Sequence, residues 1–352
     1  MSKDPQVPPV DTDFLVTFLV DLLNTPSPTG FTQLAVDRVA AAMRALGLDP
    51  RQTRKGSLVA ELPGLSADAP RGLTAHVDTL GAMVKEVKEN GRLRLTKLGG
   101  YAWNAAEGEG CTVFTHDGRR MRGSILIDIA STHVHGAKMG AQERDDEHME
   151  VRLDLRTASA AETRTTGIEV GDFVAFDPRV EVGEAGFIRS RHLDDKACVA
   201  CMLAAVKAIQ DAGLTPTQRT TLHISNYEEV GHGAAAGFPP DLAELLTLDM
   251  AALGRGQTSD EFHVTICVKD SGGPYHHGMS QDLRRLAAEH RIPAVVDIYP
   301  FYGSDGEALW RAGADIRVAL IGPGVDASHS YERTHLDALA ATTRLIIAYL
   351  LN

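Results

Sequence analysis

The pattern of hydrophobic residues changes twice along the chain, and these changes constrain the fold more than any other feature. Residues 13–23 and 31–46 carry apolar side chains at helical spacing, while 72–77 is a short apolar run typical of a strand. From about 80 to 182 helical spacing is nearly absent and strand-like runs follow one another, after which helices and strands alternate again. This order predicts an α/β layer fold that is interrupted by a small all-β domain.

The length of the chain and the positions of these changes predict two domains. A chain of 352 residues is long for a single hydrophobic core. We expect residues 1–79 and 183–352 to form an α/β domain with a mixed sheet and helices on both faces, and residues 80–182 to form an inserted, barrel-like β domain. The polar stretch 136–148 is expected to be a mobile loop, and 241–246 a short helix.

The composition excludes several classes of partner. The formal net charge is −12, and an acidic surface repels phosphate, so we expect neither nucleic acid nor an anionic membrane as a partner. No run of about 18 apolar residues predicts a membrane span. The first apolar stretch follows acidic rather than basic residues, unlike a secretory signal. We therefore expect a cytoplasmic protein.

The 4 cysteines are too few for a disulfide framework in a chain of this length. Cys198 and Cys201 form a C-x-x-C pair, but the sequence has no second pair to complete a zinc ribbon. Their neighbours are apolar, so we expect two small core residues that lie one helical turn apart.

Acidic and histidine residues recur where the predicted strands of the α/β part end. His76 stands at the end of the run 72–77, and Asp249 follows the run 246–248. In open α/β sheets, ligands bind outside the carboxyl ends of the strands, so residues far apart in the sequence have a common place to meet. The full set is His76, Asp78, Asp194, Asp195, Glu228, Glu229, Asp249 and His329.

These side chains together indicate a two-metal hydrolase. Imidazole and carboxylate groups suit zinc, cobalt or manganese, and two such ions about 3.5–4 Å apart can activate a water and clamp a scissile amide. Each motif alone has an ordinary explanation: His76 as a hydrogen-bonded core histidine, Glu228-Glu229 as a solvated pair, and Asp194 as an acid at a helix N-terminus. Their coincidence at one edge of a sheet favours the metal site, with one carboxylate left as a base.

The order of the motifs resembles that of the co-catalytic metallopeptidases with a phosphorylase/hydrolase-like sheet, and finer features resemble the TET-type (tetrahedral) aminopeptidases, also called glutamyl aminopeptidases or cellulase-like proteins. The resemblance covers nearly the whole chain, and within the family it is similar to a branch linked to the N-acetylglutaminylglutamine amide osmoprotectant. The segments that carry it are His76-Val-Asp-Thr-Leu-Gly, Gly171-Asp-Phe-Val, Leu193-Asp-Asp-Lys, Tyr227-Glu-Glu-Val-Gly, Gly303-Ser-Asp-Gly and His329-Ser-Tyr-Glu.

The resemblance implies a role for each ligand of two divalent metal ions, with zinc or cobalt expected and manganese as a further choice. Asp194 is expected to bridge both ions. Glu229 and His329 are expected to complete one site, and His76 and Asp249 the other. The peptide bond after Asp194 is expected to be cis, as in similar enzymes.

The resemblance also implies the groups that act beside the metals. Glu228 is expected to be the general base that takes a proton from the metal-bridging water, and Asp78 to orient His76. Asp305 is expected to support the substrate pocket or the metal shell. His276-His277 would ordinarily be a pair of exposed histidines; the alternatives are a place in a loop near the mouth of the site, where His276 would be a pocket residue, and a further metal site.

The expected function is a metal-dependent aminopeptidase that removes N-terminal residues from short peptides. The resemblance implies a homo-oligomer, from a dimer to a tetrahedral dodecamer, with residues 80–182 mediating assembly and walling the active site. Two alternatives remain: a dipeptidase or deacylase that acts on a modified small amide or an osmoprotectant-related dipeptide, and an inactive scaffold or peptide binder. A glycanase would leave the histidines unexplained, and aromatic residues are only 5% of the chain.

Overall fold

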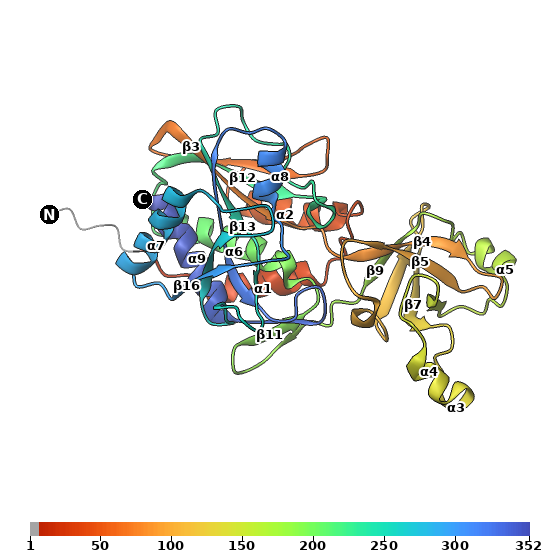
Figure 1. Cartoon of the computed structure of the whole chain (residues 1–352). Coiled ribbons are helices and arrows are strands. Elements are labelled where there is room, and N and C mark those ends of the chain that lie inside the picture. Colours follow the sequence, from red (N-terminus) through yellow and green to blue (C-terminus); the bar gives the residue numbers. More distant parts are fainter. Residues whose placement is uncertain (1–6) are drawn as a thin grey trace.

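The computed structural model describes residues 7–352 and consists of a large α/β part with a smaller barrel beside it (Figure 1). The α/β part is built on a nine-stranded mixed sheet of order β1-β2-β12-β3-β13-β17-β15-β16, with β14 paired to β17. Strands β12, β3, β13 and β17 are parallel neighbours, whereas β2 runs antiparallel to β12, and β15 runs antiparallel to β17 but parallel to β16. The strands are β1 (Arg51–Gln52), β2 (Leu58–Leu62), β3 (Ser66–His76), β12 (Gln218–Ser225), β13 (Glu244–Leu248), β14 (Ala251–Ala252), β15 (Val264–Lys269), β16 (Ala294–Ile298) and β17 (Arg317–Val325).

Helices cover both faces of this sheet because its central strands are apolar on both sides. In β13, Leu246 packs with the larger core and Leu245 with the smaller core on the opposite face. Helices α1, α2, α6, α7 and α9 contribute to the larger core, while Leu309 of α8 belongs to the smaller one. The helices are α1 (Thr12–Leu23), α2 (Gln33–Ala45), α6 (Leu193–Asp211), α7 (His277–Glu289), α8 (Asp305–Arg311) and α9 (Leu336–Leu351).

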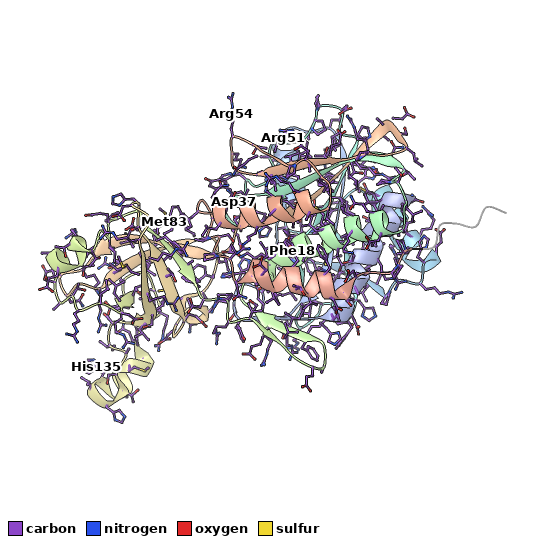
Figure 2. The ribbon with its side chains drawn as sticks, turned by 180° about the vertical axis from the view of Figure 1, so that it is seen from behind. Phe18, Asp37, Arg51, Arg54, Met83 and His135 are labelled. Atoms are coloured by element: carbon purple, nitrogen blue, oxygen red, sulfur yellow. The ribbon has the colours of Figure 1, made fainter. Side chains whose placement is uncertain are left out.

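The side of the molecule that carries α1 and α2 is seen in Figure 2, where Phe18 of α1 and Asp37 of α2 are labelled. Helix α6 packs against α1 and α9 and is buried along nearly its whole length. Cys198 and Cys201 are free, fully buried residues of α6, which confirms the prediction of two small core side chains. Within residues 7–352, no helix combines the length and the apolar character that crossing a membrane requires.

The smaller part is a closed barrel of six strands in the order β4-β5-β8-β7-β6-β9. Its own core includes Leu93, Leu95, Val113, Ile125 and Val151, all fully buried. All six strands lie within residues 80–182, where the sequence predicts strands without long helices. They are β4 (Gly81–Val87), β5 (Leu93–Leu98), β6 (Gly110–Phe114), β7 (Arg120–Ile127), β8 (Met149–Leu153) and β9 (Phe173–Phe176), accompanied by η1 (Trp103–Ala105) and α5 (Ala160–Thr165).

Two local expectations are wrong. The stretch 136–148 contains helix α4 (Ala137–Ala141), which follows α3 (Thr132–His135), and the two project from the barrel (Figures 1 and 2). Neither helix buries a residue fully, so no apolar spacing marks them in the sequence. Residues 244–246 belong to strand β13 and not to a helix, because this continuous apolar run is buried on both faces, and such runs do not distinguish a helix from a central strand.

A small sheet of β10 (Glu181–Val182), β11 (Phe187–Ser190) and β18 (Glu332–His335) lies at the start of α6. Strand β11 pairs with β18 and leads directly into α6. This pairing brings Glu332 next to the first turn of α6, although the two are far apart in the sequence. The small sheet therefore helps to fix the residues at the helix start.

Candidate metal centre

The predicted ligands meet at the carboxyl edge of the parallel strands. His76 is the last residue of β3, and Asp249 directly follows β13. Glu229 lies in the single turn η2 (Glu228–Val230) after β12, and Asp194 lies in the first turn of α6. His329 comes from the turn between β17 and β18, in the left-handed region with φ 64°. The fold thus brings together residues from five separate segments.

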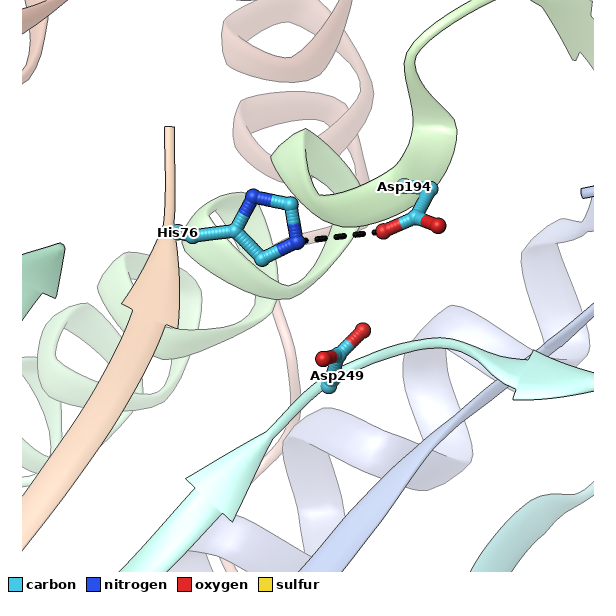
Figure 3. Close-up of side chains that lie close together, drawn as sticks. All are labelled: His76, Asp194 and Asp249. Carbon is cyan, nitrogen blue, oxygen red and sulfur yellow. Dashed lines mark hydrogen bonds and ion pairs between the residues drawn. The ribbon is translucent and has the colours of Figure 1, made fainter. Parts of the chain in front are cut away.

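These residues form two overlapping groups of possible ligands. Ligand atoms of His76, Asp194 and Asp249 lie within 4.8 Å of one another, and so do those of Asp194, Glu229 and His329 (Figure 3 shows the first group). Asp194 belongs to both groups. Its Oδ1 is 3.1 Å from Nε2 of His76, and its Oδ2 is 3.3 Å from Nε2 of His329. The peptide bond that joins Asp194 to Asp195 is cis.

Glu228 lies beside both groups and belongs to neither. Its Oε2 is 3.7 Å from Nε2 of His76. Burial raises the pKa of Glu228 well above its ordinary value, and although His76 opposes this shift, the carboxylates of Asp249 and Asp305 add to it. A carboxylate with a raised pKa next to a metal centre can accept a proton near neutral pH.

The cluster concentrates negative charge away from water. Burial and the Asp194 carboxylate raise the pKa of Glu229 to about 8, and burial with Asp195 and Asp194 raises that of Asp249 well above its ordinary value. Burial opposes protonation of His329, but Asp194 and Glu229 outweigh it and raise the pKa of the imidazole to about 11. These raised pKa values mean that positive charge at this place, either as protons or as a bound cation, stabilises the folded chain.

The donor set fits divalent cations. Within residues 7–352, no lysine or arginine forms an ion pair with Asp194, Glu229 or Asp249, and the recorded charged partners of Asp194 and Glu229 are histidines. Oε1 of Glu229 and Oδ1 of Asp195 are buried and have no hydrogen-bond partner in this part of the chain. Buried carboxylates without a basic partner are costly unless they bind a cation, and mixed imidazole and carboxylate donors suit zinc, cobalt and manganese.

The two ligand groups face a cavity of about 500 Å³. Gly100, from the barrel side of the chain, forms part of its wall, and Nδ1 of His329 is hydrogen-bonded to the Gly100 carbonyl. Apart from the histidine, Arg311 is the basic residue of the wall. The lining residues are Gly100, Asp194, Glu228, Glu229, Gly231, Asp249, Met250, Ala252, Phe301, Tyr302, Gly303, Ser304, Arg311, Ser328 and His329.

Comparison with known proteins identifies the family. The model of the M42 glutamyl aminopeptidase family matches residues 56–345. The chain belongs to this family. The Bacillus subtilis (strain 168) protein YhfE is 46% identical over 329 residues, which are 94% of this chain and 95% of YhfE. This M42 protein is therefore an aminopeptidase, a peptide hydrolase of a family that depends on divalent metals.

Solved structures share the fold of the M42 aminopeptidase. The TET aminopeptidase from a marine sediment archaeon of the Thaumarchaeota has a TM-score of 0.87 at 18% identity, covering 96% of this chain and 97% of that chain. The TET1 peptidase of Pyrococcus horikoshii has a TM-score of 0.83 at 20% identity, covering 96% and 99%. The similarity includes both the mixed sheet and the barrel, since it spans nearly all of each chain.

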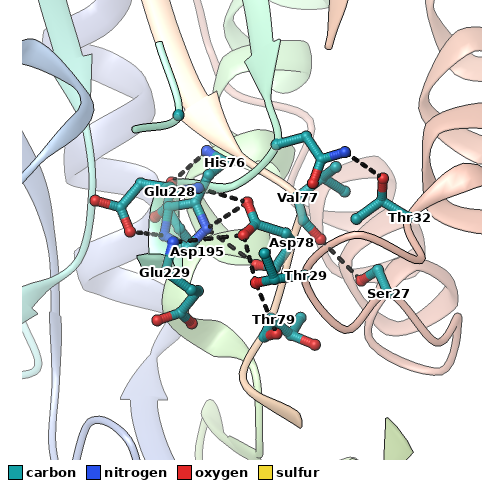
Figure 4. A network of polar contacts seen from close by, with 12 residues as sticks. Ser27, Thr29, Thr32, His76, Val77, Asp78, Thr79, Asp195, Glu228 and Glu229 are labelled. Atoms are coloured by element: carbon teal, nitrogen blue, oxygen red, sulfur yellow. Dashed lines mark hydrogen bonds and ion pairs between the residues drawn. The ribbon is translucent and has the colours of Figure 1, made fainter. Parts of the chain in front are cut away.

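Asp78 of the M42 aminopeptidase contacts more than the predicted histidine (Figure 4). Nδ1 of His76 is 3.0 Å from the backbone oxygen of Asp78 and 3.7 Å from its carboxylate. The carboxylate instead accepts hydrogen bonds from the Thr29 hydroxyl at 2.7 Å and from the amides of Glu228 and Glu229 at 3.2 and 3.4 Å. The backbone oxygen of Asp78 therefore fixes His76, and the Asp78 carboxylate fixes the turn η2 that carries Glu228 and Glu229.

Glu332 is a supporting residue to which the sequence analysis assigns no role. Its buried carboxylate accepts hydrogen bonds from the amide of Asp194 at 3.2 Å and from the amide of His329 at 3.1 Å. It thus ties together two ligands that come from different segments. A weak signal exists, because Glu332 is the last residue of the His329-Ser-Tyr-Glu segment.

Thr29 and Asp195 also support the centre. The Thr29 hydroxyl donates to Asp78, and Oδ2 of Asp195 accepts from the amide of His76 at 3.2 Å. Thr29 has no sequence signal beyond its place in a loop rich in proline and glycine. Asp195 stands next to a ligand in a motif that the sequence analysis already singles out.

Asp305 and His276 occupy different environments. Asp305 is buried near the metal centre. Its Oδ1 accepts a hydrogen bond from the amide of Ala234 at 2.7 Å and so holds the segment that follows η2. His276 is exposed, caps helix α7 by accepting from the amide of Met279, and does not line the cavity. The structure thus brings Asp305 to the site and leaves His276 outside its wall.

Proposed function

We propose that this M42 aminopeptidase binds two divalent cations and uses Glu228 as the general base that releases N-terminal residues from short peptides. One observation carries the proposal: two groups of possible ligands share Asp194, while Glu228 lies beside them and belongs to neither. In this scheme Glu229 and His329 join Asp194 around one ion, and His76 and Asp249 join it around the other.

Each residue around the centre has a distinct task in the proposed reaction. The bound ions supply an activated water and polarise the scissile carbonyl. Glu228 accepts the proton of the attacking water and passes it to the leaving amine, a task that requires a carboxylate free of metal coordination. Asp78 keeps Glu228 in place through the Glu228 amide. The carboxylates around the cavity attract the ammonium group of a free N-terminus.

The identity of the ions follows from the donors. Each proposed site offers one imidazole and two carboxylates, counting Asp194 in both. We propose zinc or cobalt as the resident ions, with manganese as a further choice, because these metals accept nitrogen and oxygen donors together.

We also propose that the protein is a homo-oligomer, from a dimer to a tetrahedral dodecamer, in which residues 80–182 mediate assembly and wall the active site. The TET1 peptidase of Pyrococcus horikoshii can assemble into a tetrahedron or a large octahedral shell. In this chain the barrel stands beside the α/β part with α3 and α4 beyond it (Figure 1), and Gly100 reaches the cavity wall. The free, buried cysteines support the proposed cytoplasmic location.

A dipeptidase or deacylase acting on a modified small amide is the second candidate. Arg311 lines the cavity and carries a positive charge that could pair with the free carboxylate of a dipeptide or of an osmoprotectant-related substrate. The same metal ligands and Glu228 would serve this reaction, and only the part of the substrate that fills the cavity would differ.

The test is mass-spectrometric cleavage of a mixed panel of free and N-acetylated short peptides in the presence of zinc, cobalt or manganese, with Glu228→Gln as the matched control. Stepwise loss of residues from free N-termini that disappears in Glu228→Gln supports the proposal. Cleavage of acylated or dipeptide substrates alone would favour the second candidate. Bound metal without any cleavage would contradict both and favour an inactive peptide binder.

A further inference from the structure

The loop 226–234, which carries Glu228, is anchored on its inner side. Tyr227, near the start of the loop, is in the left-handed region with φ 72°, and the chain continues as the single turn η2. The amide of Glu228 donates to Asp78 at 3.2 Å, and the amide of Ala234 donates to Asp305 at 2.7 Å. Both acceptors are buried carboxylates of the α/β part. These bonds fix the two ends of the turn against the sheet.

On its outer side the same loop contacts Lys55. Nζ of Lys55 donates to the backbone oxygen of His232 and, at 2.7 Å, to that of Gly233. The ammonium also lies 5.9 Å from the centre of the Tyr227 ring, which stacks on the ring of His232. Lys55 and His232 are 177 positions apart, so only the folded chain brings them together. Within residues 7–352, both recorded hydrogen bonds of this ammonium go to the loop.

A tight turn presents Lys55 to the loop. The turn joins β1 to β2, and it is closed by hydrogen bonds from the amide of Thr53 to the Ser57 carbonyl at 2.8 Å and from the amide of Gly56 to the Thr53 carbonyl at 3.0 Å. Gly56 has φ 97°, a conformation that glycine adopts without strain. Because the backbone beneath Lys55 is fixed, the side chain loses less freedom when it binds the loop.

The surrounding charges favour the ammonium form of Lys55. Burial lowers the pKa of Lys55, and the carboxylates of Asp305 and Asp78 oppose this fall. These are the same two carboxylates that hold the inner side of the loop. The loop backbone therefore lies between a cation that donates to its carbonyls and anions that accept from its amides, an arrangement in which each charge also stabilises the other.

We propose that Lys55 is a positioning residue for the general base Glu228, an inference that rests on the proposed function. A base must lie within hydrogen-bond reach of the proton that it takes, and a displacement of about 1 Å can lower turnover roughly 100-fold. Lys55 contacts no metal ligand; it restrains residues 232 and 233, which follow the turn that carries both Glu228 and Glu229. In the proposed centre Glu229 is also held by the ion that it binds, whereas Glu228 is not, so loss of Lys55 should displace Glu228 and lower kcat while the two ligand groups remain intact.

The experiment compares Lys55→Met with Lys55→Arg and with Lys207→Met, the matched control, because Lys207 of α6 pairs with Asp11 and Asp211 and does not line the cavity. Lys55→Met is expected to lower kcat by about 10- to 100-fold on a short peptide substrate, with KM nearly unchanged. Metal content and melting temperature are expected to stay close to those of the wild type. Lys55→Arg, which keeps the charge and the donors, is expected to retain most of kcat.

Two outcomes would overturn the inference: a Lys55→Met enzyme as active as Lys207→Met, or a loss of activity that follows a loss of metal or a rise in KM alone. Lys55→Cys provides a second route, because 2-bromoethylamine rebuilds a primary amine on an exposed thiol and the native cysteines are buried. Recovery of kcat on alkylation supports the role, and complete alkylation without recovery contradicts it. Wild type and Glu228→Gln run in parallel, so a wild type that cleaves no peptide counts against the proposed function instead.

Discussion

The two ligand groups differ in how the fold supports them. His76 and Asp249 stand at the ends of the neighbouring strands β3 and β13. Both are buried, with exposed fractions of 2% and 4%. Glu229 and His329 stand on a single helical turn and on a loop, and the His329 side chain is 37% exposed. We call His76, Asp194 and Asp249 the inner group, and Asp194, Glu229 and His329 the outer group. The inner group takes its geometry from strands, the outer group from turns.

This difference explains where the supporting hydrogen bonds are found. The turn that holds Glu229 needs the Asp78 carboxylate, and the loop that holds His329 needs Glu332. The inner His76 is already placed by β3, with the Asp195 carboxylate on its backbone amide and the Asp78 carbonyl on Nδ1. We infer that the inner ion is bound more tightly and that the outer ion is the more exchangeable of the two.

Removal of the shared ligand is expected to have the largest effect. Asp194→Asn replaces a bridging carboxylate with an amide that donates as well as accepts, so both ions should be lost. Because metal ions contribute several kcal/mol to such reactions, kcat/KM should fall about 1000-fold or more. Peptide kinetics and metal analysis by inductively coupled plasma mass spectrometry measure the two effects. A variant that keeps both ions would break the assignment of Asp194 as the bridge.

Loss of the Glu332 carboxylate is expected to weaken the outer group selectively. Glu332→Gln can accept from only one of the two amides without turning its own NH₂ towards the other, and the loss should fall mainly on His329, which stands on a loop, because Asp194 is also held by the first turn of α6. Substitution of such supporting groups typically costs about 10- to 100-fold in metal affinity or activity. Zinc titration of Glu332→Gln measures the metal affinity of each site, and substitution of the exposed Glu184 by Gln is the control. Equal weakening of both ions would remove the distinction between the groups.

Chelation is expected to remove the two ions at different rates. The outer group borders the cavity through Glu229 and His329, whose side chain is 37% exposed; in the inner group Asp249 also lines the cavity, but His76 does not and is 2% exposed. In a time course with EDTA, one ion per chain should leave clearly before the second, and activity should fall with the first. Release of both ions in a single phase would show that burial of the inner group does not control exchange.

Much of this architecture could be predicted because its signals are local in sequence. Helical spacing, strand-like runs and the loss of helical spacing after residue 80 mark the α/β part and the barrel. The ligands could be proposed because each follows a strand or opens a helix, and parallel strands end at one edge. The segment 241–246 was ambiguous for the same local reason, since an apolar run buried on both faces has no period.

The supporting residues could not be predicted with the same ease. Glu332, Thr29 and Lys55 act through hydrogen bonds to segments that are distant in the sequence, and no spacing rule links them. The position of His276 relative to the cavity depends on how a loop packs, which the sequence does not encode locally. Tertiary contacts decide these positions, and the helix or strand propensity of the local sequence does not.

The smallest expected effect is a pH dependence of stability in the metal-free protein. The pKa of Glu229 rises from 4.5 to about 8 in the folded chain, so the folded state binds this proton more tightly than the unfolded state. The resulting stabilisation is fully present below about pH 4.5 and is lost as the pH rises through about 8. Thermal melts in EDTA should therefore give lower melting temperatures at pH 9 than at pH 6. Saturating zinc should remove most of this slope, because a bound cation stabilises the charged carboxylate.

Glu229→Gln separates the contributions of the two groups to this slope. The variant lacks the titrating carboxyl of the outer group but keeps Asp249 of the inner group, whose pKa is also raised by burial and by its acidic neighbours. The slope of the metal-free protein should become shallower without disappearing. An unchanged slope would place the pH dependence in the inner group alone, and a slope of zero would place it in the outer group alone. Either result would contradict the view that the folded chain holds both groups together against the repulsion of their carboxylates.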